Sequence, residues 1–388
     1  MKQAIIFGAG SIGRGFIGQL FSESGYAVTF VDVDQPLLDA LNARHSYTIR
    51  LVDNDWSQDV PVGSVSALHA GDRGAVADAV SMAEVMATAV GARALPFVAP
   101  NIAAGVRRRR AAGQDMPLNC IVCENLKGAA AILLGMVHEH LDADERAYMH
   151  AHVGLVDTVI GRMVPPLTPT MRAQDPSLVL AEPYKELPVD RQGIVGPVPA
   201  ITSLVPCEDF AVYTARKLYV HNCGHAVLAY MGYLRGYTYG YEALTDPQID
   251  AALQAAWQES IAGQVARYPV KAGWLQDHAQ ALRKRFANRA LGDTVLRLGR
   301  DPIRKINPDD RLVAPARLAE AAGISPHALA QAIAAALHFD SPEDPIALEL
   351  QRRLSQDGID GVLTGICQIQ PDEPLAALIR ESYALLAR

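Results

Sequence analysis

Several features that define specialised classes of protein are scarce or absent in this sequence of 388 residues. No apolar run approaches the roughly 18 residues that a membrane-spanning helix needs. Nor is there a basic excess, because 35 lysines and arginines face 42 aspartates and glutamates, leaving a net charge of −7. A nucleic-acid binder would normally carry a net basic face. We therefore expect neither a membrane nor a nucleic acid as a partner.

Cysteine is also scarce, and the five cysteines are odd in number, which argues against a disulfide framework. Cys120 and Cys123 form a C-x-x-C pair inside the apolar segment LNCIVCEN, without a second pair at zinc-finger spacing. We interpret them as core residues and expect no metal. The N-terminal residues lack the charged, apolar and small-residue regions of a signal peptide, so a cytoplasmic location is expected.

What the sequence does contain is ample material for buried cores, since half of its residues are hydrophobic and a fifth are charged. Its length favours two domains. In the first half, strand-like runs alternate with helical spacing. The expected strands cover residues 2–7, 27–33, 85–90 and 118–123, and the expected helices cover 12–24 and 36–43. Such alternation predicts an α/β fold with a doubly wound parallel sheet.

The second half has a different, helical pattern. Two further strands, 153–164 and 178–182, are expected to close the sheet, and the Pro- and Gly-rich segment 187–206 is the best linker candidate. We therefore place a first domain at residues 1–198 and a mostly α-helical domain at 199–388. Apolar residues at three- and four-residue spacing predict helices over 210–233, 250–268, 274–287, 315–322, 326–336 and 375–386.

A glycine fingerprint follows the first expected strand. The segment Gly8-Ala9-Gly10-Ser11-Ile12-Gly13 fits G-x-G-x-x-G, the pattern of a Rossmann-like dinucleotide-binding turn. The helix that it opens directs free N–H groups toward a pyrophosphate. Asp32 ends the second strand about 20 residues on, where a carboxylate binds the adenosine ribose and disfavours a 2′-phosphate. We therefore predict NAD as cofactor, bound by the fingerprint and Asp32.

Three alternatives stay open for this region. The glycines could form a turn that binds no ligand, or the cofactor could be FAD. Arg14 could contact a phosphate or face solvent.

The most informative segment of the second half is Arg216–His225, RKLYVHNCGH. Lys217, Asn222 and His225 recur within an otherwise apolar helix and fall in an arc of roughly 140° at about 100° per residue. Alcohol oxidation needs a base and donors that hold the developing alkoxide. A partly desolvated lysine beside a cationic ring can be that base, and an amide and an imidazole can hold the oxygen. The alternative is a snorkelling lysine and a core histidine.

This motif and the N-terminal FGAGSIGRGFIG together resemble the polyol-specific long-chain dehydrogenase/reductase family. The resemblance extends along nearly the whole chain, through LNARHSY (41–47), TAVG (88–91), CEN (123–125), VPP (164–166) and GRxPxRK…DRL (299–312). It implies a metal-independent, NAD-dependent enzyme with Lys217 as general base and with Asn222 and His225 binding the reacting oxygen. Thr88 is a further cofactor-binding residue by this resemblance, and Asn125 would lie near both nicotinamide and substrate.

Two positions depart from the family pattern. Gly161-Arg162 stands where Asp-Arg is expected before the VPP turn, so one substrate-binding acid is missing. His221 stands where an apolar residue would be ordinary, and it lies four residues before His225. Two histidines at that spacing can bind zinc, but no glutamate of an H-E-x-x-H motif accompanies them.

The substrate is the least specified part of this prediction. A substrate phosphate needs cations, and Arg300, Arg304 and Lys305 are the candidates, although the loop's aspartates could instead pair with them. The resemblance implies interconversion of D-mannitol 1-phosphate and D-fructose 6-phosphate. The alternatives are a dehydrogenase of an unphosphorylated polyol or sugar acid, such as mannitol, another hexitol or a mannonate/altronate type, and a catalytically silent NAD sensor. We expect a small-molecule partner and a monomer or weak homodimer.

Overall fold

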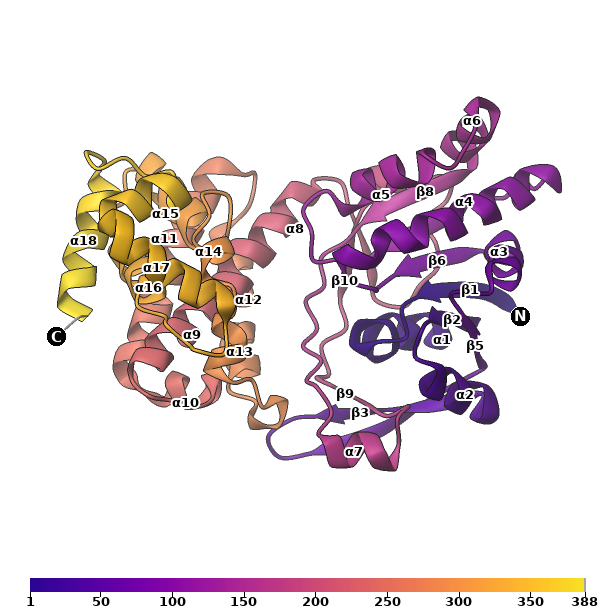
Figure 1. Ribbon diagram of the computed structural model, residues 1–388, viewed down its shortest axis with the longest axis horizontal. Coiled ribbons are helices and arrows are strands. Elements are labelled where there is room, and N and C mark those ends of the chain that lie inside the picture. The colour runs from indigo at the N-terminus through magenta and orange to yellow at the C-terminus, as the bar shows by residue number, and fades with distance from the viewer. Residues whose placement is uncertain (387–388) are drawn as a thin grey trace. The chain divides into compact units, whose positions relative to one another are not determined.

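The computed structural model describes residues 1–386, which form two compact units, Met1–Phe210 and the described residues from Ala211 onward. Each unit has its own secondary-structure class, α/β in the first and α-helical in the second (Figure 1). The predicted fold class is therefore confirmed. The units divide after Phe210 rather than after residue 198, because strands on both sides of residue 198 pair with each other in unit 1.

Unit 1 is organised around a six-stranded parallel sheet in the order β5-β2-β1-β6-β7-β8. The order reverses between β1 and β6, which is the switch point where doubly wound sheets bind dinucleotides. The strands are β1 (Lys2–Phe7), β2 (Tyr26–Asp32), β5 (Val65–His69), β6 (Val85–Thr88), β7 (Leu118–Val122) and β8 (Val153–Asp157).

Both faces of this sheet are buried, as parallel sheets require. Ile6 and Phe30 point to one face, toward η1, α1 and α2, whereas Ile5 and Phe7 point to the other, toward α3–α6. Successive residues of β1 therefore serve two cores. The helices are η1 (Gly13–Gly18), α1 (Gln19–Glu23), α2 (Gln35–Arg44), α3 (Arg73–Met82), η2 (Ala92–Ala94), α4 (Leu95–Ala111), α5 (Ala129–His138) and α6 (Ala143–His152).

Unit 1 also contains a three-stranded and a two-stranded sheet, neither of which the sequence patterns predicted. The hairpin β3 (Ser46–Val52) and β4 (Ser57–Gly63) pairs with β9 (Val179–Ala181) in a three-stranded sheet. The expected strand 178–182 thus joins β3 rather than the main sheet, and the expected strand 153–164 ends at Asp157. The segment 187–206 contains β10 (Leu187–Asp190), η3 (Arg191–Gly193) and the start of β11 (Leu204–Cys207), so it is not a linker. The remaining helix is α7 (Pro169–Gln174).

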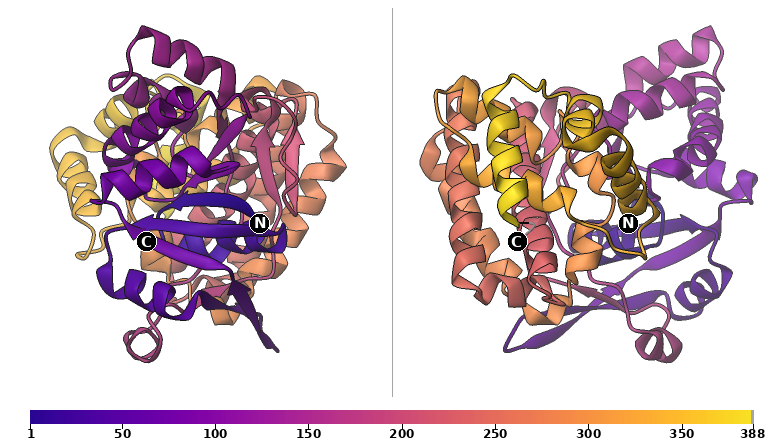
Figure 2. Two further views of the ribbon diagram at one scale, coloured as in Figure 1. Left: turned by 90° about the vertical axis from the view of Figure 1, so that its right-hand side faces the viewer. Right: turned by 60° about the vertical axis from the view of Figure 1, so that its left-hand side comes forward.

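Unit 2 is built of helices packed around α9 (Cys223–Leu234), whose residues Ala226–Tyr230 are buried (Figures 1 and 2). Helix α9 continues α8 (Phe210–Arg216) and η4 (Lys217–Asn222) without a break. Within the described part of the chain, no helix has the length and apolarity to cross a membrane. The other helices are α10 (Gly240–Thr245), α11 (Pro247–Arg267), α12 (Ala272–Phe286), η5 (Arg289–Leu291), α13 (Val295–Gly299), α14 (Pro302–Lys305), α15 (Val313–Ala321), α16 (His327–Leu337), α17 (Pro345–Val362), η6 (Leu363–Cys367) and α18 (Pro374–Leu386).

Candidate active site

The glycine loop between β1 and η1 is shaped by close backbone contacts. Gly8 has φ of +100°, and a Cβ placed on it would lie 2.4 Å from the carbonyl oxygen of Ala89. A Cβ on Gly13 would lie 1.9 Å from the carbonyl oxygen of Gly8. At Gly10, by contrast, a Cβ would meet no atom within 4 Å. Gly8 and Gly13 thus pack directly against backbone atoms of the protein, whereas the space beside Gly10 is unoccupied by protein atoms. A phosphate can approach the backbone at Gly10.

The first two residues of the helix after this loop are Ser11 and Ile12. Ser11 is exposed, and Ile12 is partly buried against the core. The amide of Arg14 donates to the carbonyl of Gly10 at 3.0 Å and closes the first turn. The preceding N–H groups have no partner within a helix, so they are available to an anion at this end.

Asp32 at the end of β2 holds the loop in place. Its Oδ2 accepts the Ala9 N–H at 2.6 Å, and its Oδ1 accepts the Val33 N–H at 2.7 Å. Oδ1 also accepts the Asp34 N–H at 3.2 Å, so the second lone pair of Oδ2 is the acceptor capacity that remains for a ribose hydroxyl.

Arg14 does not face solvent, which was one of the two roles considered for it. Its side chain is buried at 7% exposure, and its Nε donates to the Ala9 carbonyl at 2.5 Å. Its Nη1 donates to the carbonyls of Ser177 and, at 3.3 Å, Leu178. Burial lowers the pKa of this guanidinium, which joins the fingerprint loop to the segment before β9 and is not directed at solvent.

The carboxyl ends of β6 and β7 carry the other predicted cofactor residues. Thr88 is fully buried and its hydroxyl oxygen has no hydrogen-bond partner, while Asn125 is exposed. Between them, the carboxylate of Glu124 accepts the Val90 N–H at 3.0 Å. A hollow opens beside this bond on the surface of unit 1. It is lined by Val90, Gly91, Ala92, Arg93, Ala94 and Phe97.

The lysine motif of unit 2 lies on a π-helical segment, η4, between two α-helices. Lys217 and Asn222 are both partly buried at its ends. Because a π-turn joins residues five apart, it brings these two side chains closer in angle than an α-helix would. Trp257 Nε1 donates to the Val220 carbonyl at 2.8 Å, and Ser260 Oγ donates to the Tyr219 carbonyl at 2.7 Å.

The two histidines of the motif meet edge-to-face in a group of aromatic rings. His221 is 1% exposed, and its ring centroid lies 4.9 Å from that of the partly buried His225. The ring of Phe286 lies 4.2 Å from His225 and 5.7 Å from His221. Burial and then the charge of Lys217 hold both histidine pKa values well below the usual range, so both imidazoles are neutral near pH 7. Within residues 1–386, no group of three metal-binding side chains could hold a metal ion.

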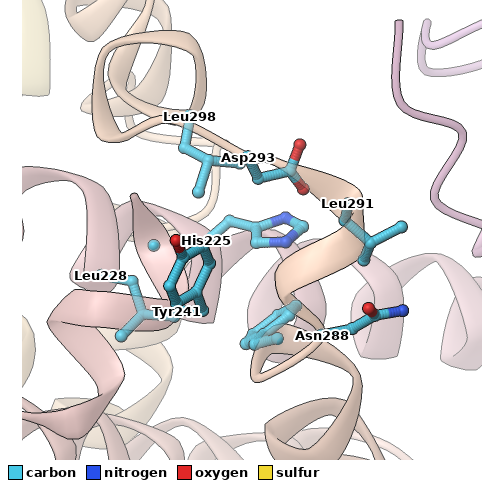
Figure 3. Close-up of a pocket in the computed structure, with 9 residues that line it drawn as sticks. His225, Leu228, Tyr241, Asn288, Leu291, Asp293 and Leu298 are labelled. Carbon is cyan, nitrogen blue, oxygen red and sulfur yellow. The ribbon is translucent and has the colours of Figure 1, made fainter. Parts of the chain in front are cut away.

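A small cavity lies beside His225 (Figure 3). His225, Tyr241 and Asp293 all line it, with the imidazole, the hydroxyl and the carboxylate among its polar groups. Arg297 pairs with the Asp293 carboxylate. Three leucines and Phe286 line the cavity as well, so the imidazole predicted to hold the reacting oxygen lies among both apolar and polar side chains. The cavity is lined by His225, Leu228, Gly240, Tyr241, Phe286, Asn288, Leu291, Asp293 and Leu298.

The three cations predicted to bind the substrate differ in their surroundings. Arg300 is exposed, directly after α13. Arg304 pairs with Asp301 at 2.9 Å and with Asp310 at 3.5 Å, the salt bridges allowed for in the sequence. Lys305 is buried at 4% exposure and donates to the carbonyl of Leu298. Burial, followed by the charge of a neighbouring arginine, lowers the Lys305 pKa to about 6.

Comparison with known families covers both units. Residues 2–203 match the mannitol dehydrogenase Rossmann domain, and residues 209–381 match the mannitol dehydrogenase C-terminal domain. The chain belongs to the mannitol dehydrogenase family. The resemblance inferred from the sequence motifs is thereby confirmed, as is the expectation of an oxidoreductase.

Similar proteins span the whole length of this family member. A mannitol-1-phosphate 5-dehydrogenase of Brevibacillus brevis is 40% identical over 381 residues, covering 97% of this chain and 96% of its own. The enzyme of the same name from Bacillus subtilis is 38% identical, with 97% and 98% covered. Among solved structures, Pseudomonas fluorescens mannitol 2-dehydrogenase in complex with NAD and D-mannitol has a TM-score of 0.79 at 20% identity, covering 100% of this chain and 92% of its own. At that identity the likeness shows the fold.

The departure from the family pattern at Gly161 has a steric counterpart. A Cβ on Gly161 would lie 2.9 Å from the ring of Tyr184, so the ring occupies the space that a side chain would need. The neighbouring Arg162 is buried, with its Nε on the Glu182 carbonyl at 2.7 Å and its Nη1 on Gln19 Oε1 at 2.6 Å. This family member therefore has a tyrosine ring beside the position where the acid was expected.

Two acids near the predicted sites were not singled out in the sequence. Glu124 lies within the CEN segment and directly follows an apolar strand, and that position was the available signal. Asp293 lies beside His225 although the two are far apart in sequence, and no local pattern indicates it.

Proposed function

We propose that this member of the mannitol dehydrogenase family is an NAD-dependent oxidoreductase that interconverts D-mannitol 1-phosphate and D-fructose 6-phosphate. The observation that carries the proposal is full-length identity of 38–40% to two enzymes named mannitol-1-phosphate 5-dehydrogenase. The intact set Lys217, Asn222 and His225 argues against a silent NAD sensor, which needs no such set.

The cofactor assignment is supported by the residues of unit 1. Gly10 leaves the backbone open to a pyrophosphate, and Asp32 keeps acceptor capacity for a ribose hydroxyl. A carboxylate at that point disfavours NADP. NAD, when bound, exchanges a hydride with the substrate carbon. The site-residue assignments to Ser11, Ile12, Gly13, Thr88 and Asn125 stay predictions.

In unit 2 we assign the proton chemistry to Lys217. Its amine takes the hydroxyl proton in the oxidation direction and returns it in reduction. The Asn222 amide and an N–H of the neutral His225 donate to the oxygen as its charge changes. Because Lys217 must be neutral to accept the proton, the oxidation rate should rise with pH, and a rate that is flat between about pH 6 and 10 would count against a lysine base.

The assignment of phosphate binding rests mainly on Arg300. Arg300 is exposed, whereas Arg304 and Lys305 already bind groups of unit 2. Because Arg304 and Lys305 are already bonded within the protein, fewer cations remain for a substrate phosphate. This favours the second candidate function, a dehydrogenase of an unphosphorylated polyol or sugar acid. The two candidates share the fold, the cofactor and Lys217, and they differ in whether a phosphate contributes to substrate binding.

The deciding experiment follows the absorbance of reduced nicotinamide with fructose 6-phosphate and free fructose offered in parallel, each with NADH and with NADPH. Rapid NADH oxidation with fructose 6-phosphate alone supports the proposal, and Arg300→Ala should then raise KM for that substrate with little change for NADH. Turnover with free fructose alone would transfer the assignment to the second candidate. Absence of turnover with both, and with uronates, would overturn both enzyme proposals.

A cytoplasmic location and a monomeric or weakly dimeric state complete the proposal. Sedimentation at micromolar concentration tests the second, and a stable higher oligomer would contradict it.

A further inference from the structure

Carboxylates hold the loops at the carboxyl-terminal edge of the main sheet in unit 1. Each accepts a backbone N–H from a loop or helix start that passes over this edge. The pairs are Asp32 with Ala9 at 2.6 Å, Glu124 with Val90 at 3.0 Å, and Asp157 with Ala130 at 2.9 Å. Asp32 belongs to the adenosine side of the predicted cofactor site, and the other two carboxylates have no part in the function proposed so far.

Glu124 is the most buried of these acids, with 6% exposure. Its charge acts on its surroundings, since burial first and the Glu124 carboxylate second raise the pKa values of the Cys123 and Cys120 thiols. A carboxylate withdrawn from water in this way exerts a stronger field on nearby charges than an exposed one. Its effect on a ligand at this edge is therefore larger than that of a surface acid.

The position of Glu124 relative to the switch point indicates which part of the cofactor it faces. Asp32 ends β2, on one side of the point between β1 and β6, so the adenosine half belongs on that side. Glu124 follows β7, on the opposite side, and its partner Val90 lines the hollow next to β6. The nicotinamide half of a dinucleotide lying across the switch point therefore reaches the edge that Glu124 supports.

We infer that Glu124 makes the nicotinamide end of this site selective for the redox state of the cofactor, favouring NAD⁺ over NADH. The inference deepens the proposed function and rests on it. The oxidised ring carries a positive charge and the reduced ring none, so a fixed buried carboxylate attracts only the oxidised form. Stabilising bound NAD⁺ shifts the equilibrium on the enzyme toward ketose reduction, in which NADH gives up its hydride.

Other charges near this edge do not cancel the effect. Arg93 and Lys127 are both exposed, where water and salt screen them. The carboxylate of Asp157, on the next strand, is partly buried and has the same sign as Glu124. A buried negative charge therefore lies next to Val90, which lines the hollow.

The test is Glu124→Gln, which removes the charge and keeps an oxygen that can accept the Val90 N–H. Purified protein is titrated separately with NAD⁺ and NADH, with binding followed by calorimetry. The Kd for NAD⁺ should rise about tenfold, the order expected for one partly screened charge, while the Kd for NADH changes by less than about twofold. Equal weakening of both, or no change in their ratio, would overturn the inference.

Glu84→Gln is the matched control, because Glu84 is an exposed acid just before β6, at the opposite edge of the sheet. It should leave both Kd values unchanged. If the Gln variant does not fold, Glu124→Asp replaces it: this variant keeps the charge, so the two affinities should fall together with their ratio retained, and a lost ratio would contradict the inference. Failure of the wild-type protein to bind either cofactor would instead refute the proposed function.

Discussion

The two units stabilise their predicted sites mainly with opposite kinds of hydrogen bond. In unit 1, acidic side chains accept backbone N–H groups, as Asp32 and Glu124 do with the two loops at the sheet edge, although Arg14 also donates to the Ala9 carbonyl there. In unit 2, donor side chains bind backbone carbonyls, as Trp257, Ser260 and Lys305 do. The difference follows from the backbone, because loops that open helices present unpaired N–H groups, whereas a π-turn and the end of a helix present unpaired carbonyls.

This contrast separates a predicted cofactor site formed by main chain from a predicted catalytic site formed by side chains. In the first, close contacts at glycines define the shape of the loop. In the second, the position of Lys217 depends on partners from another helix. Substitutions in the two units should therefore fail in different ways, and four predictions test that expectation in order of decreasing effect.

The largest effect is expected at Lys217. Lys217→Ala should lower kcat by about 10²–10⁴-fold, because the proposed general base is lost, with the Kd for NAD unchanged within about twofold. Steady-state rates and calorimetric titration measure the two quantities. A variant that loses NAD affinity instead would place Lys217 outside the proton chemistry.

In unit 1, the matched pair Gly13→Ala and Gly10→Ala separates sterics from ligand binding. The first places a Cβ 1.9 Å from the Gly8 carbonyl and should cost about 3 kcal/mol or more of unfolding free energy. The second meets no protein atom within 4 Å, so the apoprotein should keep its stability while NAD affinity falls. Urea unfolding and NAD titration distinguish them; equal stability loss in both variants would contradict the loop geometry.

In unit 2, the buried Lys305 makes stability depend on pH. The folded-state pKa of about 6 lies below the ordinary lysine value of 10.5, so between these values the unfolded chain binds the extra proton. The free energy of unfolding therefore rises with pH across this window. Below about pH 6 the folded protein carries the full destabilisation of burying a charged Lys305. Lys305→Met should raise the unfolding free energy by about 2 kcal/mol at pH 7 and flatten the profile. Denaturant unfolding from pH 6 to 9 measures both, and parallel profiles would count against a neutral buried amine.

The smallest effect is expected for the support of the π-turn. Trp257→Phe keeps a ring but leaves the Val220 carbonyl without this donor, which should cost about 1–2 kcal/mol and lower kcat severalfold. The Kd for NAD should not change, because Trp257 lies in unit 2. Arg267→Gln, on an exposed position of the same helix, is the control. Unchanged kcat with lost stability would restrict Trp257 to a structural role.

Secondary-structure elements could be predicted from the sequence where the physical signals are local. Strand β1 and the π-to-α helix of 13–23 were expected within a few residues of their bounds. Both signals, an apolar run and the glycine fingerprint that follows it, lie within short windows of sequence. The hairpin β3–β4 was not predicted, and the strand at 178–182 was predicted but assigned to the main sheet, because its partner β3 lies more than a hundred residues earlier in the chain. The segment 187–206 was also interpreted as a linker, because Pro and Gly are frequent both in linkers and in the irregular chain that flanks the short strands β10 and β11.

For this chain, the order of residues alone was enough to indicate the fold class, the family and the candidate residues of both sites, because each depends on residue types at short spacing. The three-dimensional arrangement was needed to show that Arg14 and Lys305 are buried and bonded within the protein, that Tyr184 fills the space beside Gly161, and that η4 is a π-turn supported by α11. Arg14, Gly161 and η4 have partners far along the chain in Ser177, Tyr184 and Trp257, whereas Lys305 bonds to the nearby Leu298 and is buried by the packing around it. Burial and hydrogen-bond satisfaction are properties of the packed chain, and no local window contains them.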